Sequence, residues 1–210
     1  MSSVLDQLAS ALGRNDEQPN IEMAERLAAM PDKAAIAELV ATLKTGPAAI
    51  ANDAIKVLYE LGERRPELIA DHADAFSATL TSKNNRLVWG GMSALDTIAA
   101  ASGSALAERL PEILRAADKG SVIAKDKAVS ILAKLVAAGH AKALPALLAM
   151  VEAAAVNHLP MYAEMAAPAI DRSHQAMFVA IITKRLETID QPSKRARLEK
   201  LLRKLAKSRA

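Results

Sequence analysis

The chain contains no cysteine and only five aromatic residues among its 210 residues. The absence of cysteine excludes disulfide frameworks, thiol nucleophiles and cysteine-ligated zinc. The shortage of aromatic residues argues against a sheet-rich fold, because strands favour aromatic and β-branched side chains. Alanine, by contrast, occurs 46 times, and it is the residue that most favours the α-helix. The composition therefore predicts closely packed helices.

Long hydrophobic runs are also missing. Charges interrupt every apolar run before it reaches the roughly 18 consecutive residues that a transmembrane helix needs. Residues 1–14 lack the positive lead and the long apolar segment of a secretory signal, and Asp6 lies where that segment would have to run. We therefore expect a cytoplasmic protein with no transmembrane segment.

Apolar residues recur three and four positions apart along most of the chain, and short Pro, Gly, Asn or Asp signals separate the periodic segments. This is the spacing of amphipathic helices. The predicted helices span residues 3–12, 20–30, 32–44, 48–63, 67–81, 84–101, 104–117, 121–138, 141–154, 157–171, 173–190 and 193–208. The pattern predicts an all-α fold of about six antiparallel helix pairs.

The apolar positions of these pairs recur at a fixed step of 37 residues. The step relates Leu39, Phe76, Ile113 and Met150 in the first helices, and it relates Leu58, Leu95 and Leu132, as well as Ala54, Gly91 and Ala128, in the second helices. A helical hairpin of this length cannot bury its apolar faces alone, so neighbouring hairpins stack on a shared core. The repeat therefore predicts a right-handed α-α superhelix, an α-solenoid. A mid-helix glycine costs about 1 kcal/mol relative to alanine, so we expect Gly91 to serve a close helix contact.

The ends of the chain depart from the regular step. We predict one α-solenoid domain over residues 1–210, with an N-terminal cap at 1–31, four repeats over 32–171, and a basic C-terminal capping helix pair at 172–210. Terminal units of a solenoid are atypical because their outer face meets water. Within the fourth copy, Pro160 and Pro168 interrupt the helix pattern, and we expect them to bend it.

Residues 110–114 and 144–148 each place a proline near the start of a predicted first helix, and residues 84–98 combine a polar turn with a second helix. These segments resemble the HEAT-repeat family, and the resemblance covers about residues 32–171. Lys125 and Lys127 depart from the family pattern in the third copy. The resemblance implies a curved stack with first helices on the convex side and second helices on the concave side. Proteins of this family mostly bind other proteins, and a minority bind nucleic acid.

Several positions on the second helices turn away from the core at 100° per residue, toward the expected concave face. They are Asn52, Lys56, Tyr59, Trp89, Ser93, Asp96, Asp126 and Ser130. Exposed Trp and Tyr are favoured anchors at protein interfaces, so this row is the predicted binding surface for a protein or peptide partner. The alternative is that Trp89 fills the groove between adjacent repeats as a packing residue.

Positive charge gathers at the C-terminal end. Residues 173–210 carry a net charge of +7, whereas residues 1–172 carry −4. The possible phosphate-binding residues on the last helix are Lys194, Arg195, Arg197, Lys200, Arg203, Lys204 and Lys207, with Arg209 beyond them. A cationic amphipathic helix can follow phosphates or lie on an anionic membrane. A capping helix with a solvated outer face, whose cations complement the helix dipole, explains the same pattern.

The residues that support catalysis or metal binding are sparse. The histidines at 72, 140, 158 and 174 lack the spacing of a metal site, and no glycine-rich phosphate-binding loop occurs. We therefore predict no metal, no cofactor and no catalytic residues. The leading hypothesis is a non-enzymatic HEAT-repeat scaffold or adaptor that binds a protein or peptide on its concave surface. The alternative is a nucleic-acid-binding HEAT-like protein that uses the basic C-terminal helix.

Overall fold

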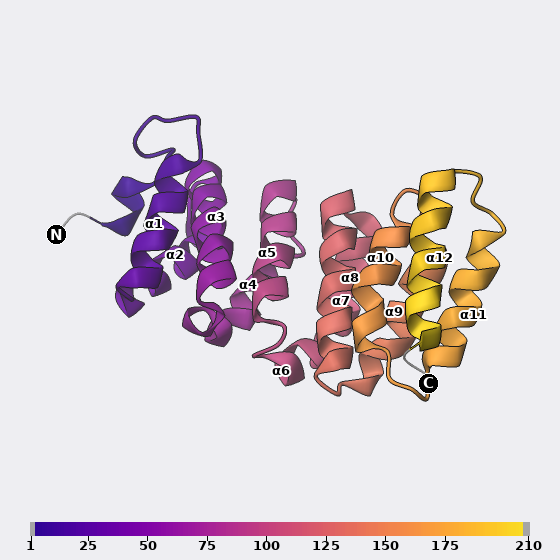
Figure 1. Cartoon of the computed structure of the whole chain (residues 1–210). Coiled ribbons are helices and arrows are strands. Elements are labelled where there is room, and N and C mark those ends of the chain that lie inside the picture. The colour runs from indigo at the N-terminus through magenta and orange to yellow at the C-terminus, as the bar shows by residue number, and fades with distance from the viewer. Residues whose placement is uncertain (1–2, 208–210) are drawn as a thin grey trace. The chain divides into compact units, whose positions relative to one another are not determined.

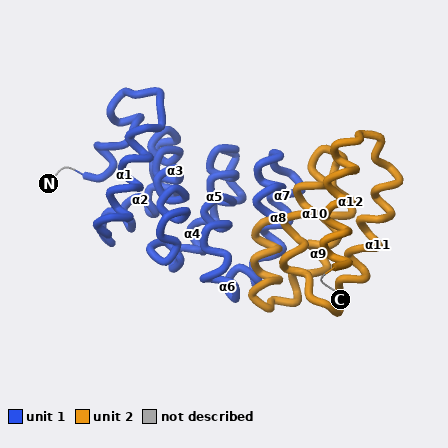
Figure 2. The backbone as a smooth tube through the Cα atoms, in the orientation of Figure 1, with its two compact units in different colours: residues 1–128 blue, residues 129–210 orange. Residues whose placement is uncertain are grey.

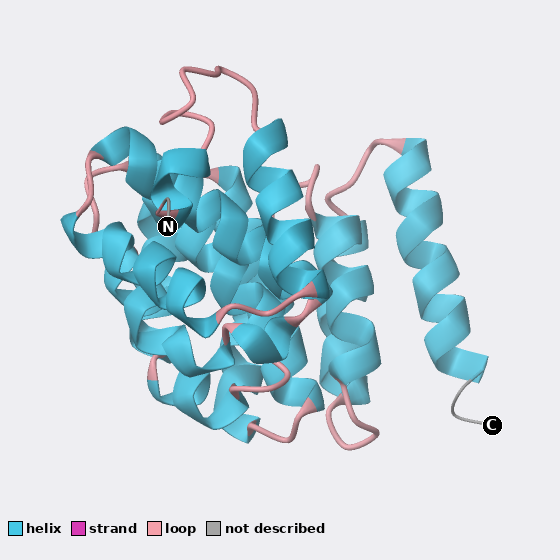
Figure 3. Ribbon diagram, turned by 90° about the vertical axis from the view of Figure 1, so that its left-hand side faces the viewer, coloured by secondary structure: helices cyan, strands magenta, loops and turns pink. Residues whose placement is uncertain are grey.

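The computed structural model describes residues 3–207, and within that range it consists of helices and loops without a strand (Figures 1 and 3). The α-helices are α1 (Gln18–Ala29), α2 (Lys33–Thr45), α3 (Ala48–Arg64), α4 (Ala73–Thr79), α5 (Asn85–Ile98), α6 (Gly103–Glu108), α7 (Leu110–Lys119), α8 (Val122–Ala137), α9 (Leu144–Ala153), α10 (Leu159–Ala166), α11 (Gln175–Leu186) and α12 (Pro192–Lys207). Short 3-10 helices are η1 (Val4–Gln7), η2 (Pro66–Leu68), η3 (Ala70–His72), η4 (Ala141–Ala143) and η5 (Ala167–Ala169). The predicted all-α class is confirmed. No helix among the described residues is long and apolar enough to cross a membrane.

Several predicted helices are divided, and prolines lie at most of the divisions. The predicted helix 104–117 consists of α6 and α7, because Pro111 lies in the first turn of α7 and disfavours helical backbone before it. Pro160 likewise lies in the first turn of α10, and Pro168 lies in η5 directly after it. The expectation that these two prolines bend a helix is wrong, because they mark its beginning and its end.

Two further departures lie in the N-terminal half. In place of the predicted helix 67–81, the chain forms η2, which starts at Pro66, then η3, and only then the short helix α4. In place of the predicted helix 3–12, it forms η1 and a series of turns that reach Gly13, whose φ is +68°. A left-handed φ is compatible with glycine and rarely with other residues.

The chain divides into two compact units, residues 1–128 and residues 129–210, and the division falls within α8 (Figure 2). In unit 1, α3 packs against α1, α2 and α5, while α4 packs against α2 and α5. In unit 2, α9 and α12 each pack against α10 and α11. Unit 1 has 14 basic and 18 acidic residues, whereas unit 2 has 13 basic and 6 acidic residues. The single solenoid domain expected over residues 1–210 stays a prediction.

The buried side chains follow the 37-residue step. Leu39, Phe76 and Ile113 are fully buried, as are Leu58, Leu95 and Leu132. The prediction of a core position is wrong for Met150, which is half-buried, and the fully buried neighbour in α9 is Val151. The regular burial pattern thus weakens at the fourth copy, where the sequence repeat is also weakest.

Glycines permit close contacts between helices in unit 1. A Cβ atom on Gly91 of α5 would lie 3.0 Å from the carbonyl oxygen of Phe76 in α4, and it would also collide with the side chain of Thr79. A Cβ atom on Gly90 would lie 2.8 Å from Cγ1 of Ile55 in α3. Gly62 of α3 in turn faces the side chain of Thr97 in α5. The expected close contact at Gly91 is confirmed.

We predict that Gly91→Ala destabilises unit 1. The added methyl group must displace the backbone of α4, and such overpacking costs about 1–3 kcal/mol, which exceeds the gain of about 1 kcal/mol in helix propensity. Thermal unfolding followed by circular dichroism should give a lower midpoint, by several degrees. Adding Thr79→Ala should recover part of the loss, because it removes one of the two colliding groups. An unchanged midpoint in the single variant would contradict the close contact.

Candidate functional site

The predicted concave row is largely inaccessible. Lys56 and Tyr59 are each 8% exposed, Ser93 is 4% exposed and Asp96 is 6% exposed. The expectation that these four side chains face solvent is therefore wrong. Helical periodicity predicted that these side chains point away from the core of their own hairpin. In the structure, other residues of the chain cover that face of α3 and α5. The remaining members of the row, Asn52, Trp89, Asp126 and Ser130, are half-buried.

Lys56 lies at the centre of an ion-pair cluster in unit 1. Its Nζ atom is 2.7 Å from Oε1 of Glu60 and 3.2 Å from Oε2 of Glu17. The same ammonium group lies 4.9 Å from the centroid of the Tyr59 ring, a cation–π distance. The Tyr59 ring in turn lies 5.8 Å from the Trp89 ring, with an angle of 51° between the ring planes. Lys56, Tyr59 and Trp89 thus lie close together, and Tyr59 contacts both Lys56 and Trp89 within the chain.

Two arginines complete this cluster. Nη1 of Arg64 lies 2.7 Å from Oε2 of Glu60, and Nη2 of Arg64 lies 3.2 Å from Oε1 of Glu25. Arg86 of α5 pairs with Glu17, which precedes α1. Sequence reasoning missed these partners because Glu17 is distant along the chain from both Lys56 and Arg86, and no short spacing indicated the contact.

The cluster shifts the pKa values of its members. Burial alone would lower the pKa of Lys56, but the hydrogen bond from the ammonium group to Glu60 and the neighbouring Tyr59 raise it. Burial alone would raise the pKa of Glu60, but hydrogen bonds from Lys56 and Arg64 lower it. Burial raises the pKa of Tyr59. Lys56 and Glu60 are therefore charged at neutral pH and neutralise each other, which suits a structural role better than proton transfer.

Buried polar contacts also hold the N-terminal segment against α3. The Nδ2 atom of Asn20 donates to Oδ1 of Asp53 at 2.9 Å, and Oδ1 of Asn20 accepts from the backbone nitrogen of Ala9 at 3.0 Å. The backbone nitrogen of Ser10 donates to Oδ2 of Asp53 at 2.7 Å.

Two members of the predicted row on α5 also have partners within unit 1. Asp96 accepts from Nζ of Lys127 at 3.1 Å, and the hydroxyl of Ser93 donates to the carbonyl of Trp89 at 3.0 Å. These contacts organise unit 1 internally.

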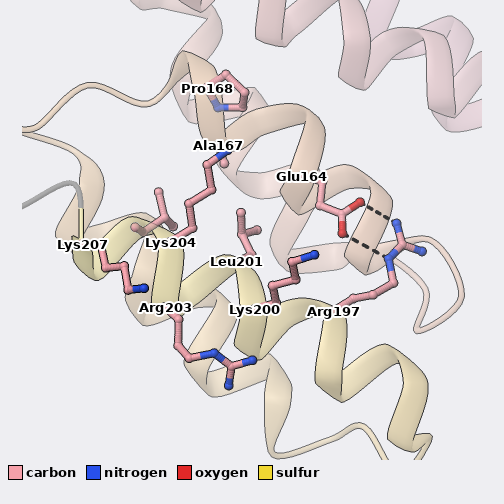
Figure 4. A pocket seen from close by; sticks show the side chains of 10 residues that line it. Glu164, Ala167, Pro168, Arg197, Lys200, Leu201, Arg203, Lys204 and Lys207 are labelled. Atoms are coloured by element: carbon pink, nitrogen blue, oxygen red, sulfur yellow. Dashed lines mark hydrogen bonds and ion pairs between the residues drawn. The ribbon is translucent and has the colours of Figure 1, made fainter.

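A cavity of about 630 Å³ lies in unit 2 along α12, and we call it the cationic groove (Figure 4). Its lining residues are Glu164 of α10, Ala167 and Pro168 of η5, and Arg197, Lys200, Leu201, Arg203, Lys204, Leu205 and Lys207 of α12. In the close-up, Lys204 extends from α12 toward Ala167, whereas Arg203 points away from η5. The groove combines small and aliphatic side chains with a series of cations.

The predicted phosphate-binding residues differ in how they are engaged. Lys194 donates to the side chain of Asn157. Arg195 donates from Nη1 to the carbonyl oxygens of Leu186 at 2.7 Å and Ile189 at 3.2 Å. These two cations hydrogen-bond the beginning of α12 to other residues of unit 2. Because their donors are used within the chain, we expect them to contribute little to phosphate binding.

The other members of that set line the groove. Arg197 forms a two-point pair with Glu164, with 3.1 Å between Nε and Oε1. Lys200, Arg203, Lys204 and Lys207 form no salt bridge with any residue in the range 3–207. Arg209, also named from the sequence, lies outside the described residues. Four cations of α12 are therefore free to meet an external anion.

Two further cavities lie in unit 1. One, of about 380 Å³, lies between the turn that precedes α5 and helix α7, and the buried Oε2 atom of Glu112 has no hydrogen-bond partner among the described residues. Arg115 and Lys119 line the same cavity, so its charge does not favour one class of ligand. The other, of about 880 Å³, lies beside η1, the end of α1 and the start of α2, and it has no comparable charge pattern.

No group of three potential metal-ligating side chains occurs within residues 3–207. The Asp171–His174 pair lies in the segment directly before α11. Oδ1 of Asp171 accepts from the backbone nitrogen of His174 at 3.0 Å and from the hydroxyl of Ser173 at 2.6 Å, and it lies 2.9 Å from Nδ1 of His174. These hydrogen bonds, above all that from Ser173, lower the pKa of Asp171 to about 2.

A comparison of the sequence with protein-family models and with curated proteins finds no match. The fold is similar to that of two engineered proteins solved by the Northeast Structural Genomics Consortium. One superposes with a TM-score of 0.60 at 16% identity, over 98% of this chain and 98% of the other chain. The second superposes with a TM-score of 0.59 at 17% identity, over 96% of this chain and 58% of the other chain. At such identities the similarity concerns the fold alone.

We predict that Lys56→Met destabilises unit 1 by about 2 kcal/mol, because it leaves Glu17 and Glu60 close together without their shared cation. Fluorescence of Trp89, the sole tryptophan, should report this as earlier unfolding in urea. Glu67→Gln, in the exposed pair with Arg65, is the control and should change stability by less than about 0.5 kcal/mol. Equal effects of the two substitutions would contradict a central role for Lys56.

The same cluster predicts a pH dependence. Because the folded-state pKa of Glu60 is lowered from 4.5, its contribution to stability is present above pH 4.5 and is lost as the pH falls through the folded value. Urea unfolding at pH 6 and pH 3 should therefore show a smaller acid-induced loss in Lys56→Met than in the original chain. An equal loss in both would show that the Lys56–Glu60 pair does not cause the shift.

We predict that the Asp171 carboxyl titrates near pH 2 and that Ser173→Ala raises this pKa toward 3.8, because the hydroxyl hydrogen bond is the largest cause of the shift. The stabilising contribution of the charged Asp171 carboxylate is lost as the pH falls through the folded-state value. Carbon-13 NMR of the carboxyl group measures the titration directly. A midpoint near 4 in the original chain would contradict the hydrogen bonds from Ser173 and His174 to this carboxylate.

Proposed function

We propose that this protein is a non-enzymatic, HEAT-like α-solenoid that binds a protein partner. Support for the solenoid comes from the 37-residue step and from its agreement with full burial at positions such as Leu58, Leu95 and Leu132. A helical array of this kind offers a long surface for a partner because each hairpin packs mainly on its neighbours. The sequence resemblance to HEAT repeats favours a protein ligand over a small substrate.

We further propose that the cationic groove, rather than the buried row of α3 and α5, receives the partner. The observation that carries this is the set of four cations on α12 without an intramolecular carboxylate. Lys200 and Lys204 are four residues apart, as are Arg203 and Lys207, and such like-charged pairs destabilise a helix by a few tenths of a kcal/mol each. An acidic segment of a partner would remove this repulsion. Trp89 is half-buried, and its role as an interface anchor stays a prediction.

Nucleic acid is the second candidate ligand, and the same four cations favour it. Phosphate contacts would make the affinity fall linearly in log K against log salt, with a slope set by the number of phosphates contacted. The two candidates differ in the anion that is presented, so they can be compared on one protein with a labelled acidic peptide and a labelled DNA duplex.

We predict that the triple variant Lys200→Gln/Lys204→Gln/Lys207→Gln binds a fluorescein-labelled dodecamer of glutamate about tenfold more weakly than the original chain. Each exposed ion pair contributes up to about 1 kcal/mol, so the loss of three pairs is measurable by fluorescence anisotropy at low salt. Glutamine preserves helix propensity, and circular dichroism verifies the fold.

The matched control is Lys142→Gln/Arg172→Gln/Lys184→Gln, which removes three positive charges from unit 2 outside the groove. It should bind the peptide nearly as well as the original chain. Equal losses in both triple variants would show that net charge, rather than the groove, attracts the peptide. Tighter binding of a 12-base-pair DNA duplex, lost in the groove variant alone, would establish the second candidate.

A further inference from the structure

The cationic groove has an apolar floor as well as a charged rim. Ala167 and Pro168 of η5 and Leu201 and Leu205 of α12 supply the apolar lining of this floor. Leu205 is only half-buried, so part of its aliphatic surface stays accessible to a ligand. A ligand that carries charge alone would leave this surface without an apolar partner, and burial of apolar area is the main favourable contribution to most protein association.

The rim cations follow one face of α12. Lys200, Lys204 and Lys207 are spaced four and three residues apart, which aligns them along the helix. At 1.5 Å per residue they extend over about 10 Å along the axis. A second helix lying alongside presents side chains at the same spacing, so acidic residues at positions i, i+4 and i+7 of a partner helix would match all three lysines.

At the end of the groove formed by Glu164, the negative charge of Glu164 is balanced by the positive charge of Arg197. Arg197 pairs with Glu164 through two contacts, so the groove's acidic residue does not repel an incoming carboxylate. Because Arg197 already pairs with Glu164, Lys200, Lys204 and Lys207 are the cations on this face of α12 that can pair with a ligand. In the close-up, this ion pair lies at the end of the row of cations opposite Lys207 (Figure 4).

The lining argues against nucleic acid as the occupant. No aromatic side chain lines the groove, so bases cannot stack there as they do on aromatic platforms of single-strand-binding proteins. The side chains of the apolar floor offer a phosphate no hydrogen-bond donor and no positive charge. A volume of about 630 Å³ corresponds to a pocket for a compact ligand, here a few side chains projecting from a partner.

We infer that the groove binds an acidic amphipathic helix of a partner protein, with apolar side chains on the floor of Ala167, Pro168, Leu201 and Leu205 and carboxylates at Lys200, Lys204 and Lys207. This inference rests on the proposed function and specifies its partner. The recognition mode is that of a helix docked in a groove, in which the apolar residues recur three and four positions apart.

The test compares two labelled peptides of identical length, composition and net charge on the full chain. One places leucines at positions i, i+3, i+4 and i+7 with glutamates on both flanks, and the other permutes the same residues so that the leucines spread around the helix. We expect the amphipathic peptide to bind at least tenfold more tightly. Carbon-13 shifts of a labelled amphipathic peptide should also move to helical values when it binds.

Ala167→Gln tests the floor separately from the rim, because its longer side chain would occupy the groove without changing a charge. It should reduce the advantage of the amphipathic peptide to less than threefold. Ala146→Gln is the matched control, since Ala146 is a half-buried alanine of α9 that does not line the groove. That variant should retain the full difference between the two peptides, and circular dichroism verifies that both variants fold.

The outcomes separate this inference from the proposed function. Equal binding of both peptides, lost in the triple lysine variant, would overturn the amphipathic helix and leave the proposed function intact. No binding of either peptide or of the glutamate dodecamer would overturn both. Tighter binding of the DNA duplex than of the amphipathic peptide would also overturn the inference and would favour nucleic acid as the ligand.

Discussion

Close packing of helix against helix is the constraint on which the rest of unit 1 depends. The chain has no disulfide, few aromatic side chains and no strand among its described residues, so the apolar faces of its helices must bury one another. Helix α3 contacts α1, α2 and α5, and it can approach α5 because Gly62 and Gly90 place no side chain between the two helices. Small residues thus set the spacing that the large aliphatic residues then fill.

The same close packing explains why the ion-pair cluster of unit 1 is structural. Once α3 and α5 lie together, Lys56 and Tyr59 are covered, and burying a charge is tolerated only when partners replace its hydration. Glu60 and Glu17 supply those partners to Lys56. The result is a polar cluster that joins the segment before α1 to α3, and each charge in it has a partner of opposite sign.

Helix α12 has the opposite arrangement. It buries Leu198 and Leu201 on one side, while Lys200, Lys204 and Lys207 lie along the groove without internal carboxylates. Unit 2 contains few acidic residues, and Glu164 is already paired with Arg197, so no residue of the described part of unit 2 neutralises these lysines. The difference between the paired charges of unit 1 and the unpaired lysines of α12 is the physical reason why we propose that unit 2 binds the partner.

The sequence by itself determined the all-α class, the positions of most of the longer helices and most of the core, because amphipathic spacing and the 37-residue step depend on local geometry. It also determined that positive charge gathers on α12. Only the tertiary structure decided that Lys56 and Asp96 are buried and that Lys204 lies beside Ala167. A helical wheel shows which side of a helix a residue occupies, whereas contacts with residues distant in the sequence decide whether that side meets water or another helix.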